Sequence, residues 1–489
     1  MVRIFVLAGL LGAAAALHPL LRTNFDVMDL VEHEHGVENT RAVINEEYFI
    51  TQKLDHNDVY NTKVWSQRFF TNDEFYGGPG SPVFVYINGE NVARNTTVVS
   101  TGLFMNVLAK KHKALIVSLE HRYYGKSQPL SDFTTASLKY LSAEQALNDL
   151  VNFQDHLTVK RNLTKDSKWV AFGGSYPGML AAWAKLKHGS RFAGSVASSG
   201  PILAKGDYHE YADTVAFGLK YYGGDACVNT VKVGLEGLHT LLGSSKPEDV
   251  TQLQALFKLC SPVKNDFDRM TVESWVFGNF QGTAQSNDNT AFNLNSTCTL
   301  FAQPNKTPLE KLAEHNARYT STCTDSDFKD SWVTPLSNTT LSTTKIGRQW
   351  IYQTCAEFGY GQTTASAKSI FSALSYNDID KVLYEMCSQA YGIPKAQIDA
   401  AIAATNKKYG ALQIDVENVI FPNGNIDPWS ALSVTNATGV MNPKSELVFI
   451  NGTSHCRDMS AAKATDSGAL VWAHQRVELA VERFLHNQC

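Results

Sequence analysis

The sequence lacks a surplus of positive charge. Its 43 Lys and Arg residues stand against 47 Asp and Glu residues, which gives a formal net charge of -4 at pH 7. A protein that binds a nucleic-acid backbone needs basic residues to neutralise the phosphates. We therefore exclude nucleic acid as a partner. With 489 residues, 44% of them hydrophobic, the chain can form one large core with an insertion, or two domains.

Beyond its N-terminus the sequence lacks any apolar run that could cross a membrane. The N-terminal run, MVRIFVLAGLLGAAAALHP, is shorter than the roughly 20 residues that a spanning helix needs. Arg3 precedes the run, and Ala14 and Ala16 form the Ala-x-Ala pattern that signal peptidase recognises. We predict a cleaved signal peptide over residues 1–16, with a membrane anchor as the alternative. The mature protein would then be secreted, or would reach a lysosome or another vesicle.

No cysteine occurs before Cys227, and no two cysteines are spaced as Cys-x-x-Cys, which argues against a zinc cluster. The cysteines form an even set, as expected for disulfides in an oxidising compartment. We expect up to four disulfides in the later part of the chain, one of which holds Cys456. Their pairing cannot be read from the sequence, and we expect no metal and no cofactor. The eight cysteines are Cys227, Cys260, Cys298, Cys323, Cys355, Cys387, Cys456 and Cys489.

Asn-x-Ser/Thr sequons agree with export, because this pattern is the acceptor for N-glycosylation in secreted proteins. We expect several of them to be glycosylated. They begin at Asn95, Asn162, Asn295, Asn305, Asn338, Asn436 and Asn451.

Short β-rich runs at 83–87, 114–119, 169–172 and 447–450 are each followed by polar or glycine-rich residues. Parallel strands covered by helices on both faces have this pattern. Helical patterns dominate residues 205–408, and strand character returns at 418–421. We predict an α/β fold in two parts, residues 40–204 and 409–489, with a mainly helical cap, residues 205–408, inserted between them over the functional edge of the sheet.

Residues 168–186, KWVAFGGSYPGMLAAWAKL, predict a strand, a tight turn and a helix, with Ser175 in the turn. Glycines before the serine permit the strained backbone of a nucleophile elbow. Ser175 would also lie at a helix N-terminus, which stabilises a developing oxyanion. Pro177 replaces the last glycine of the usual Gly-x-Ser-x-Gly pattern, and the first turn of a helix accommodates proline. An ordinary Gly-Ser turn is the alternative.

Two partners for this serine follow it in the chain. Asp427 lies in VIFPNGNIDPW and His455 in LVFINGTSHCRDM, each just after an apolar run. An α/β-hydrolase presents its acid and its base after the serine, in this order, from loops that follow late strands. The order therefore predicts Ser175 as the nucleophile, His455 as the general base and Asp427 as the acid that orients it.

An oxyanion hole needs two backbone N–H groups. The chain position of the elbow predicts that one comes from Tyr176. The other would come from the loop after an early strand, VYINGEN, at Gly89 or Glu90. Close by in the sequence, Glu120 and Arg122 are expected to form a structural ion pair or hydrogen-bond network near the elbow.

Several motifs resemble the serine carboxypeptidase S28 family, above all its branch of thymus-specific serine proteases. They are GGSYPG at 173–178, EHRYYGKS at 120–127, NGNIDPW at 423–429, TSHCRDM at 453–459, QKLDH at 52–56 and YQTCAEFGY at 352–360. The resemblance covers nearly the whole mature chain. It implies an α/β-hydrolase fold with a helical cap before the catalytic Asp, the same triad of Ser175, Asp427 and His455, and cleavage next to proline.

The function predicted from these features is that of a serine exopeptidase acting on short peptides. Such an enzyme must bind a charged chain end. The acidic candidates Glu90 and Glu357 slightly favour release of N-terminal dipeptides over carboxypeptidase action, for which Arg457 and Lys126 are the cationic candidates. Glu357 is either a substrate-binding residue or a solvated residue of the cap. The alternative functions are an esterase or lipase with the same triad and an inactive secreted binding protein. The sequence leaves open whether the protein forms a homodimer.

Overall fold

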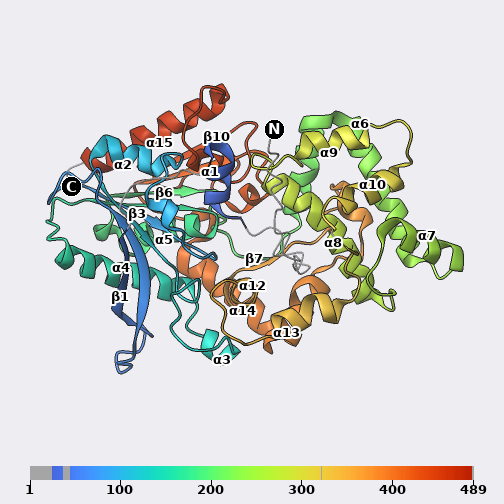
Figure 1. Cartoon of the computed structure of the whole chain (residues 1–489), viewed down its shortest axis with the longest axis horizontal. Helices are drawn as coiled ribbons and strands as arrows, with labels where there is room; N and C mark the ends of the chain where they lie inside the picture. The colour runs from blue at the N-terminus through green and yellow to red at the C-terminus, as the bar shows by residue number, and fades with distance from the viewer. Residues whose placement is uncertain (1–24, 37–44, 321, 487–489) are drawn as a thin grey trace, which may run out of the picture.

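The structure is a computed structural model that describes residues 25–36, 45–320 and 322–486 (Figure 1). The expected signal peptide, residues 1–16, lies outside these ranges, as does Cys489. Within the ranges, none of the helices combines the length and the apolar character that crossing a bilayer requires.

An 8-stranded sheet has the strand order β1-β2-β4-β3-β5-β6-β9-β10. Strands β1 and β2 form an antiparallel edge, and all pairs from β4 to β10 are parallel. This topology is the predicted α/β-hydrolase fold. The strands are β1 (Asn45–Lys53), β2 (Val64–Asn72), β3 (Val83–Ile87), β4 (Leu115–Leu119), β5 (Trp169–Gly174), β6 (Gly194–Ser198), β9 (Val419–Gly424) and β10 (Glu446–Ile450).

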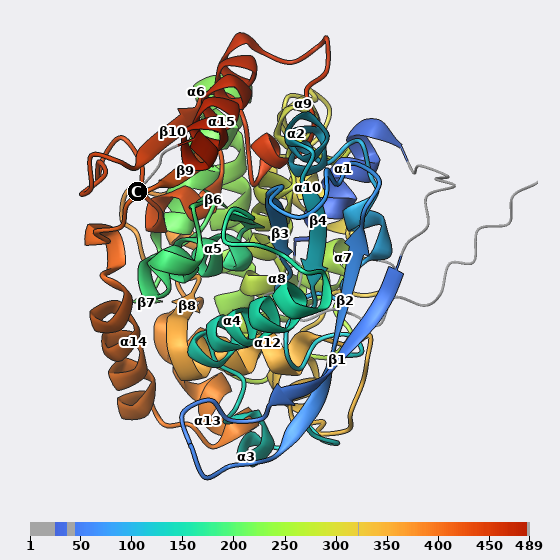
Figure 2. The ribbon, with the colours of Figure 1, turned by 90° about the vertical axis from the view of Figure 1, so that its left-hand side faces the viewer.

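Helices cover both faces of the sheet (Figure 2). Because successive side chains of a strand point to opposite faces, Val83 and Val85 of β3 pack in one core with α4 (Ala143–Lys160) and α5 (Tyr176–Lys187). Phe84 packs in the other core, together with residues of α1 (Val27–His35), α2 (Phe104–His112) and α15 (Gly468–His486). Burial on both sides explains why β3, β4 and β5 consist of unbroken buried runs.

Between β6 and β9 the chain is mainly helical, and we propose that residues 205–408 form the cap. In Figure 1 helices α6 to α10 lie on the side of the molecule away from α2 and α15. Two short parallel strands, β7 (Lys205–Asp207) and β8 (Gly359–Gly361), also belong to the cap. Its helices are α6 (Glu210–Gly243), α7 (Pro247–Phe257), α8 (Asp266–Gln285), α9 (Leu294–Phe301), α10 (Pro308–Ala317), α11 (Thr334–Leu336), α12 (Gly347–Gln353), α13 (Met386–Tyr391) and α14 (Lys395–Tyr409); the short α3 (Thr135–Leu138) precedes the cap.

In the part of the chain that the structure describes, three disulfides join residues of the proposed cap: Cys227–Cys298, Cys260–Cys323 and Cys355–Cys387. The prediction that Cys456 is disulfide-bonded is wrong, because this cysteine is free and fully buried. Its side chain points into the core beneath the elbow, where a Cβ atom added to Gly174 would lie 2.8 Å from the Cys456 Sγ. Packing therefore holds the loop around Cys456.

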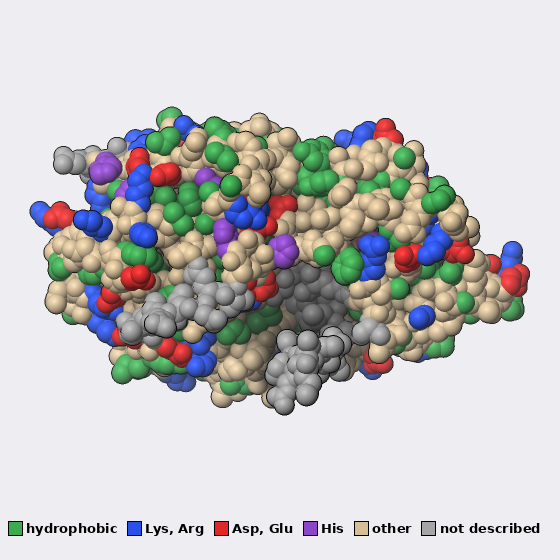
Figure 3. Space-filling view, turned by 45° about the horizontal axis from the view of Figure 1, so that its top comes forward, with side chains coloured by type: hydrophobic (Ala, Val, Ile, Leu, Met, Phe, Trp, Pro, Cys, Tyr) green, Lys and Arg blue, Asp and Glu red, His purple; other side chains and the backbone are tan. Residues whose placement is uncertain are grey.

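Charged side chains of both signs are interspersed over the face shown in Figure 3. This distribution agrees with the near balance of 43 basic and 47 acidic residues in the sequence.

Candidate active site

Ser175 lies between β5 and α5 in a strained backbone conformation. Its φ of 65° and ψ of -132° are rarely adopted by residues other than glycine. The flanking glycines make the turn sterically feasible, because a Cβ on Gly173 would lie 2.1 Å from the Pro177 carbonyl oxygen and one on Gly178 would lie 2.5 Å from that of Ser198. The turn has the geometry that a nucleophile elbow requires.

His455 and Asp427 meet beside this edge of the sheet. Asp427 follows β9 and His455 follows β10, and Nδ1 of the imidazole lies 2.8 Å from Oδ2 of Asp427. Both side chains are fully buried. Asp427 also accepts the backbone N–H of Trp429 at 2.9 Å, which fixes the carboxylate. If Nδ1 carries the proton, the other ring nitrogen is left as an acceptor.

The second nitrogen of His455, Nε2, is buried and has no hydrogen-bond partner among the described residues. Burial by itself would lower the pKa of His455, but the charge of Asp427 and the hydrogen bond to it, with a contribution from Cys456, hold this pKa well above its usual value. The imidazole is thus suited to take up a proton and to remain stable as an imidazolium.

The two candidate sources of an oxyanion hole are in contact. Gly89, after β3, packs so closely on the elbow that a Cβ at this position would lie 2.5 Å from the Pro177 Cγ. Tyr176 is the first residue of α5, so the helix itself offers its N–H no partner. The structure therefore brings Gly89, Glu90, Ser175 and Tyr176 together.

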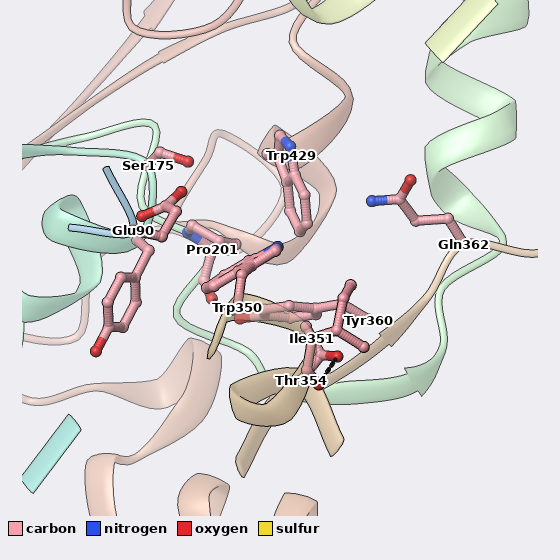
Figure 4. Close-up of a pocket in the computed structure, with 10 residues that line it drawn as sticks. Glu90, Ser175, Pro201, Trp350, Ile351, Thr354, Tyr360, Gln362 and Trp429 are labelled. Atoms are coloured by element: carbon pink, nitrogen blue, oxygen red, sulfur yellow. Dashed lines mark hydrogen bonds between the residues drawn. The ribbon is translucent and has the colours of Figure 1, made fainter. Parts of the chain in front are cut away.

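A pocket of about 470 Å³ opens beside Ser175, between the sheet and the cap (Figure 4). Aromatic rings from both parts of the chain enclose it. In Figure 4 the carboxyl group of Glu90 extends toward Ser175. The pocket is lined by Glu90, Ser175, Tyr176, Pro201, Trp350, Ile351, Thr354, Tyr360, Gln362 and Trp429.

Glu90 is an unusual carboxyl group for this position. Its side chain is only 5% exposed, and among the described residues it forms no ion pair and accepts no hydrogen bond from another residue. Burial raises its pKa to about 7, although its own backbone N–H and the nearby His455 oppose the rise. Glu90 can therefore change its charge near neutral pH.

Glu357, the other predicted acidic residue, lies outside the residues that line this pocket. Its two carboxylate oxygens lie 3.1 and 3.0 Å from the backbone N of Ala143, the first residue of α4. The structure thus places this carboxylate against a helix N-terminus, where a negative charge is favourable.

The expected network near the elbow is present, but Glu120 and Arg122 do not pair with each other. Arg68 donates to Glu120, with Nε at 3.1 Å. Arg122 binds Asp149 through two contacts of 2.6 Å. Both pairs are buried. One ties β2 to the segment that follows β4, and the other ties this segment to α4.

Sequence reasoning did not identify the aromatic wall of the pocket or the residue that covers the base. Trp429 lies within the NGNIDPW motif, two residues after Asp427, and this position could have marked it as a residue of the pocket. Trp350 and Tyr360 come from the cap, far from Ser175 in sequence. Phe25 contacts the ring of His455, and nothing in the sequence around it marks this contact.

Comparisons with known proteins agree with this geometry. The chain is 32% identical over 456 residues to the K12H4.7 protein of Caenorhabditis elegans, which covers 89% of this chain and 87% of that protein. It is 30% identical over 464 residues to the thymus-specific serine protease of Mus musculus, and the aligned region covers 92% of this chain and 89% of that protein. It is 26% identical over 453 residues to the lysosomal Pro-X carboxypeptidase of Homo sapiens, and the aligned region covers 87% of this chain and 85% of that protein.

A match to the family described as serine carboxypeptidase S28 extends over residues 52–477. This range contains the elbow, the cap, Asp427 and His455. The chain therefore belongs to the serine carboxypeptidase S28 family and is a serine-type peptidase.

Proposed function

We propose that the protein is a serine exopeptidase that cleaves short peptides next to proline through an acyl-enzyme on Ser175. The observation that carries this proposal is the strained Ser175 turn at the same sheet edge as the buried His455–Asp427 pair. Asp427 fixes the tautomer of His455, and His455 serves as the general base.

The chemistry follows in two half-reactions. Nε2 of His455 accepts the proton of the Ser175 hydroxyl while Oγ bonds to the scissile carbonyl carbon. The carbonyl oxygen becomes an oxyanion, to which the N–H of Tyr176 and that of Gly89 or Glu90 donate. The imidazolium then protonates the leaving amine as the C–N bond breaks. In the second half, His455 removes a proton from water, the resulting hydroxide attacks the acyl carbon, and the Ser175 oxygen leaves with the proton.

The shape of the pocket supports a preference for proline. Trp350, Tyr360 and Trp429 present flat apolar rings beside Ser175, and Pro201 completes an apolar wall. A pyrrolidine ring is compact and rigid, so it can stack on such rings with little loss of conformational entropy. A relative whose name specifies Pro-X carboxypeptidase activity supports the same preference.

The charges around Ser175 support release of N-terminal dipeptides over carboxypeptidase action. Glu90 offers a carboxylate, and no Lys or Arg is among the described residues that line the pocket. The cationic candidates are engaged elsewhere: Arg457 binds Glu34 and Asp466, and Lys126 binds Glu46. We choose Glu90 over Glu357 because the latter binds the backbone of α4. The carboxypeptidase name of one relative favours the opposite direction.

The test combines a fluorophosphonate probe with a set of short proline-containing peptides whose termini are free, acetylated or amidated. We expect the probe to label wild type but not Ser175→Ala, and we expect acetylation of the N-terminus to abolish cleavage. If wild type is never labelled, or the Ser175→Ala variant still is, the nucleophile assignment is wrong. If amidation abolishes cleavage and acetylation does not, the enzyme is a carboxypeptidase.

A further inference from the structure

Helix α1 lies before residue 52, where the family match begins, yet it contacts the loops that carry the active site. Arg94, in the loop after β3, pairs with Asp26 at 3.0 Å and with Glu32 at 3.3 Å. At the other end of the helix, Glu34 pairs at 3.0 Å with Arg457, in the loop that carries His455. Helix α1 therefore links the oxyanion-hole loop to the base.

Phe25, which precedes the N-cap residue Asp26 of this helix, contacts the base itself. Its ring meets the imidazole of His455 edge to face, with centroids 4.9 Å apart and planes inclined by 82°. The Phe25 side chain is only 7% exposed, and its carbonyl oxygen accepts a hydrogen bond of 3.1 Å from the Asn91 side chain. The backbone of Phe25 is thus tied to Asn91, and its buried ring packs against the imidazole.

We propose that Phe25 is a positioning residue for catalysis, whose ring covers the imidazole of His455, keeps water from the His455–Asp427 pair and holds the base in its orientation toward Ser175. A charge pair is stronger where water is excluded, because the effective dielectric constant is lower. An imidazole free to turn would also spend less time in the geometry that proton transfer needs. Phe25 thereby becomes part of the catalytic apparatus, whereas Leu30 and the other core residues of α1 only support the helix.

The position of Phe25 separates its effect on chemistry from any effect on substrate binding. Phe25 does not line the pocket beside Ser175; it lines a second cavity, of about 390 Å³, that shares Glu90 with that pocket. Loss of its ring should therefore lower kcat and leave KM nearly unchanged. The inference rests on the proposed triad but not on the proposed direction of cleavage.

The test compares Phe25→Ala and Phe25→Leu with the control Leu30→Ala. Leu30 is 1% exposed, lies on α1 and packs in the same core, so its truncation reports the cost of weakening the helix. For each variant, kcat and KM for a cleaved peptide, the rate of Ser175 labelling by a fluorophosphonate and the midpoint of thermal unfolding are measured. The labelling rate depends on the triad and not on peptide specificity.

We expect Phe25→Ala to lower kcat and the labelling rate by about 10- to 100-fold, the range that misplacement of a catalytic group can produce. Phe25→Leu, which still covers the ring with an apolar group and should fold even if the alanine variant does not, should lose less. Leu30→Ala should retain both rates at a comparable loss of thermal stability. Wild-type rates in both Phe25 variants, or an equal loss in Leu30→Ala, would overturn the inference. If wild type is not labelled at all, the proposed triad is at fault instead.

Discussion

Burial lowers the pKa of His455 and raises the pKa of Glu90, because it disfavours the charged form of each side chain. Burial opposes the charge of His455, yet Asp427 restores it and holds the imidazole pKa well above its usual value. Glu90 lacks such a partner among the described residues, so burial prevails and raises its pKa from 4.5 to about 7. An unpaired buried carboxylate is costly unless a cation arrives with the ligand. The ammonium group of a peptide N-terminus would supply that cation.

Replacing Glu90 should remove discrimination between free and blocked N-termini. We expect Glu90→Gln to lower kcat/KM for peptides with a free N-terminus by at least about tenfold, the order of one charge-assisted hydrogen bond. In wild type we compare kcat/KM for peptides with a free N-terminus with kcat/KM for acetylated peptides. The ratio of the two should increase as the pH is raised through about 7, because Glu90 then becomes negatively charged. In the variant this ratio should be small and flat. A ratio unchanged by the substitution would exclude Glu90 as the ammonium site.

At the level of residues, chain order was a strong predictor, and contacts made across the fold were not predictable. The elbow motif and the Ser–Asp–His order pointed to three residues that the structure brings to one edge of the sheet. Phe25 and Trp350 reach the site from distant parts of the chain, and no local pattern encodes such an approach. The pairing of Cys456 was misjudged because an even number of cysteines says nothing about which of them are buried.

At the level of elements, the strands most easily read from the sequence were those buried on both faces. β3 and β5 consist of buried apolar runs, so they stood out. β6 (Gly194–Ser198) was missed because its residues, GSVAS, are small: a Cβ on Gly194 would lie 2.3 Å from the ring of Phe484, so α15 packs too close for a larger side chain. Among residues 46–53 of the edge strand β1 only Phe49 and Gln52 are buried. Charged and polar residues flank the short apolar run at 48–50, so this strand did not stand out as a buried one.

The junction between α4 and the cap offers a prediction about pH and stability. Burial raises the pKa of Glu357 to about 8 from an ordinary 4.5, although the N–H of Ala143 and Lys408 lower it. Between these values the folded protein keeps a proton that the unfolded chain releases, so this group makes folding less favourable as the pH rises. We expect the melting temperature of wild type to fall more between pH 5 and 8 than that of Glu357→Gln.

Glu310 provides the matched control for this experiment. It is an exposed member of the capping box of α10, and hydrogen bonds from Thr307 lower its pKa. Glu310 therefore changes the free energy of unfolding with pH only below pH 4.5, which lies outside the measured range. Glu310→Gln should leave the slope between pH 5 and 8 as in wild type. Equal slopes in wild type and Glu357→Gln would show that Glu357 does not titrate in this window.

At the level of the whole molecule, the covalent cross-links and the catalytic residues lie in different parts of the chain. All three disulfides found among the described residues connect positions between Cys227 and Cys387, whereas Ser175, Asp427 and His455 lie outside that range. The catalytic edge is held by the sheet and its two cores. The disulfides instead fix the cap, which supplies half of the pocket wall, so they should govern substrate binding more than chemistry.

The Cys355–Cys387 disulfide should therefore affect KM more than any other cross-link. Cys355 follows Thr354, which lines the pocket, so cleavage of this bond should loosen the wall beside Trp350 and Ile351. We expect the double substitution Cys355→Ser and Cys387→Ser to raise KM for peptides several-fold while Ser175 still reacts with a fluorophosphonate at nearly the wild-type rate. Removing Cys260 and Cys323, which close a longer loop of 63 residues against 32 and lie outside the pocket, should cost at least as much stability without raising KM. An equal rise of KM in both double variants would show that general loss of stability, and not the local wall, determines substrate affinity.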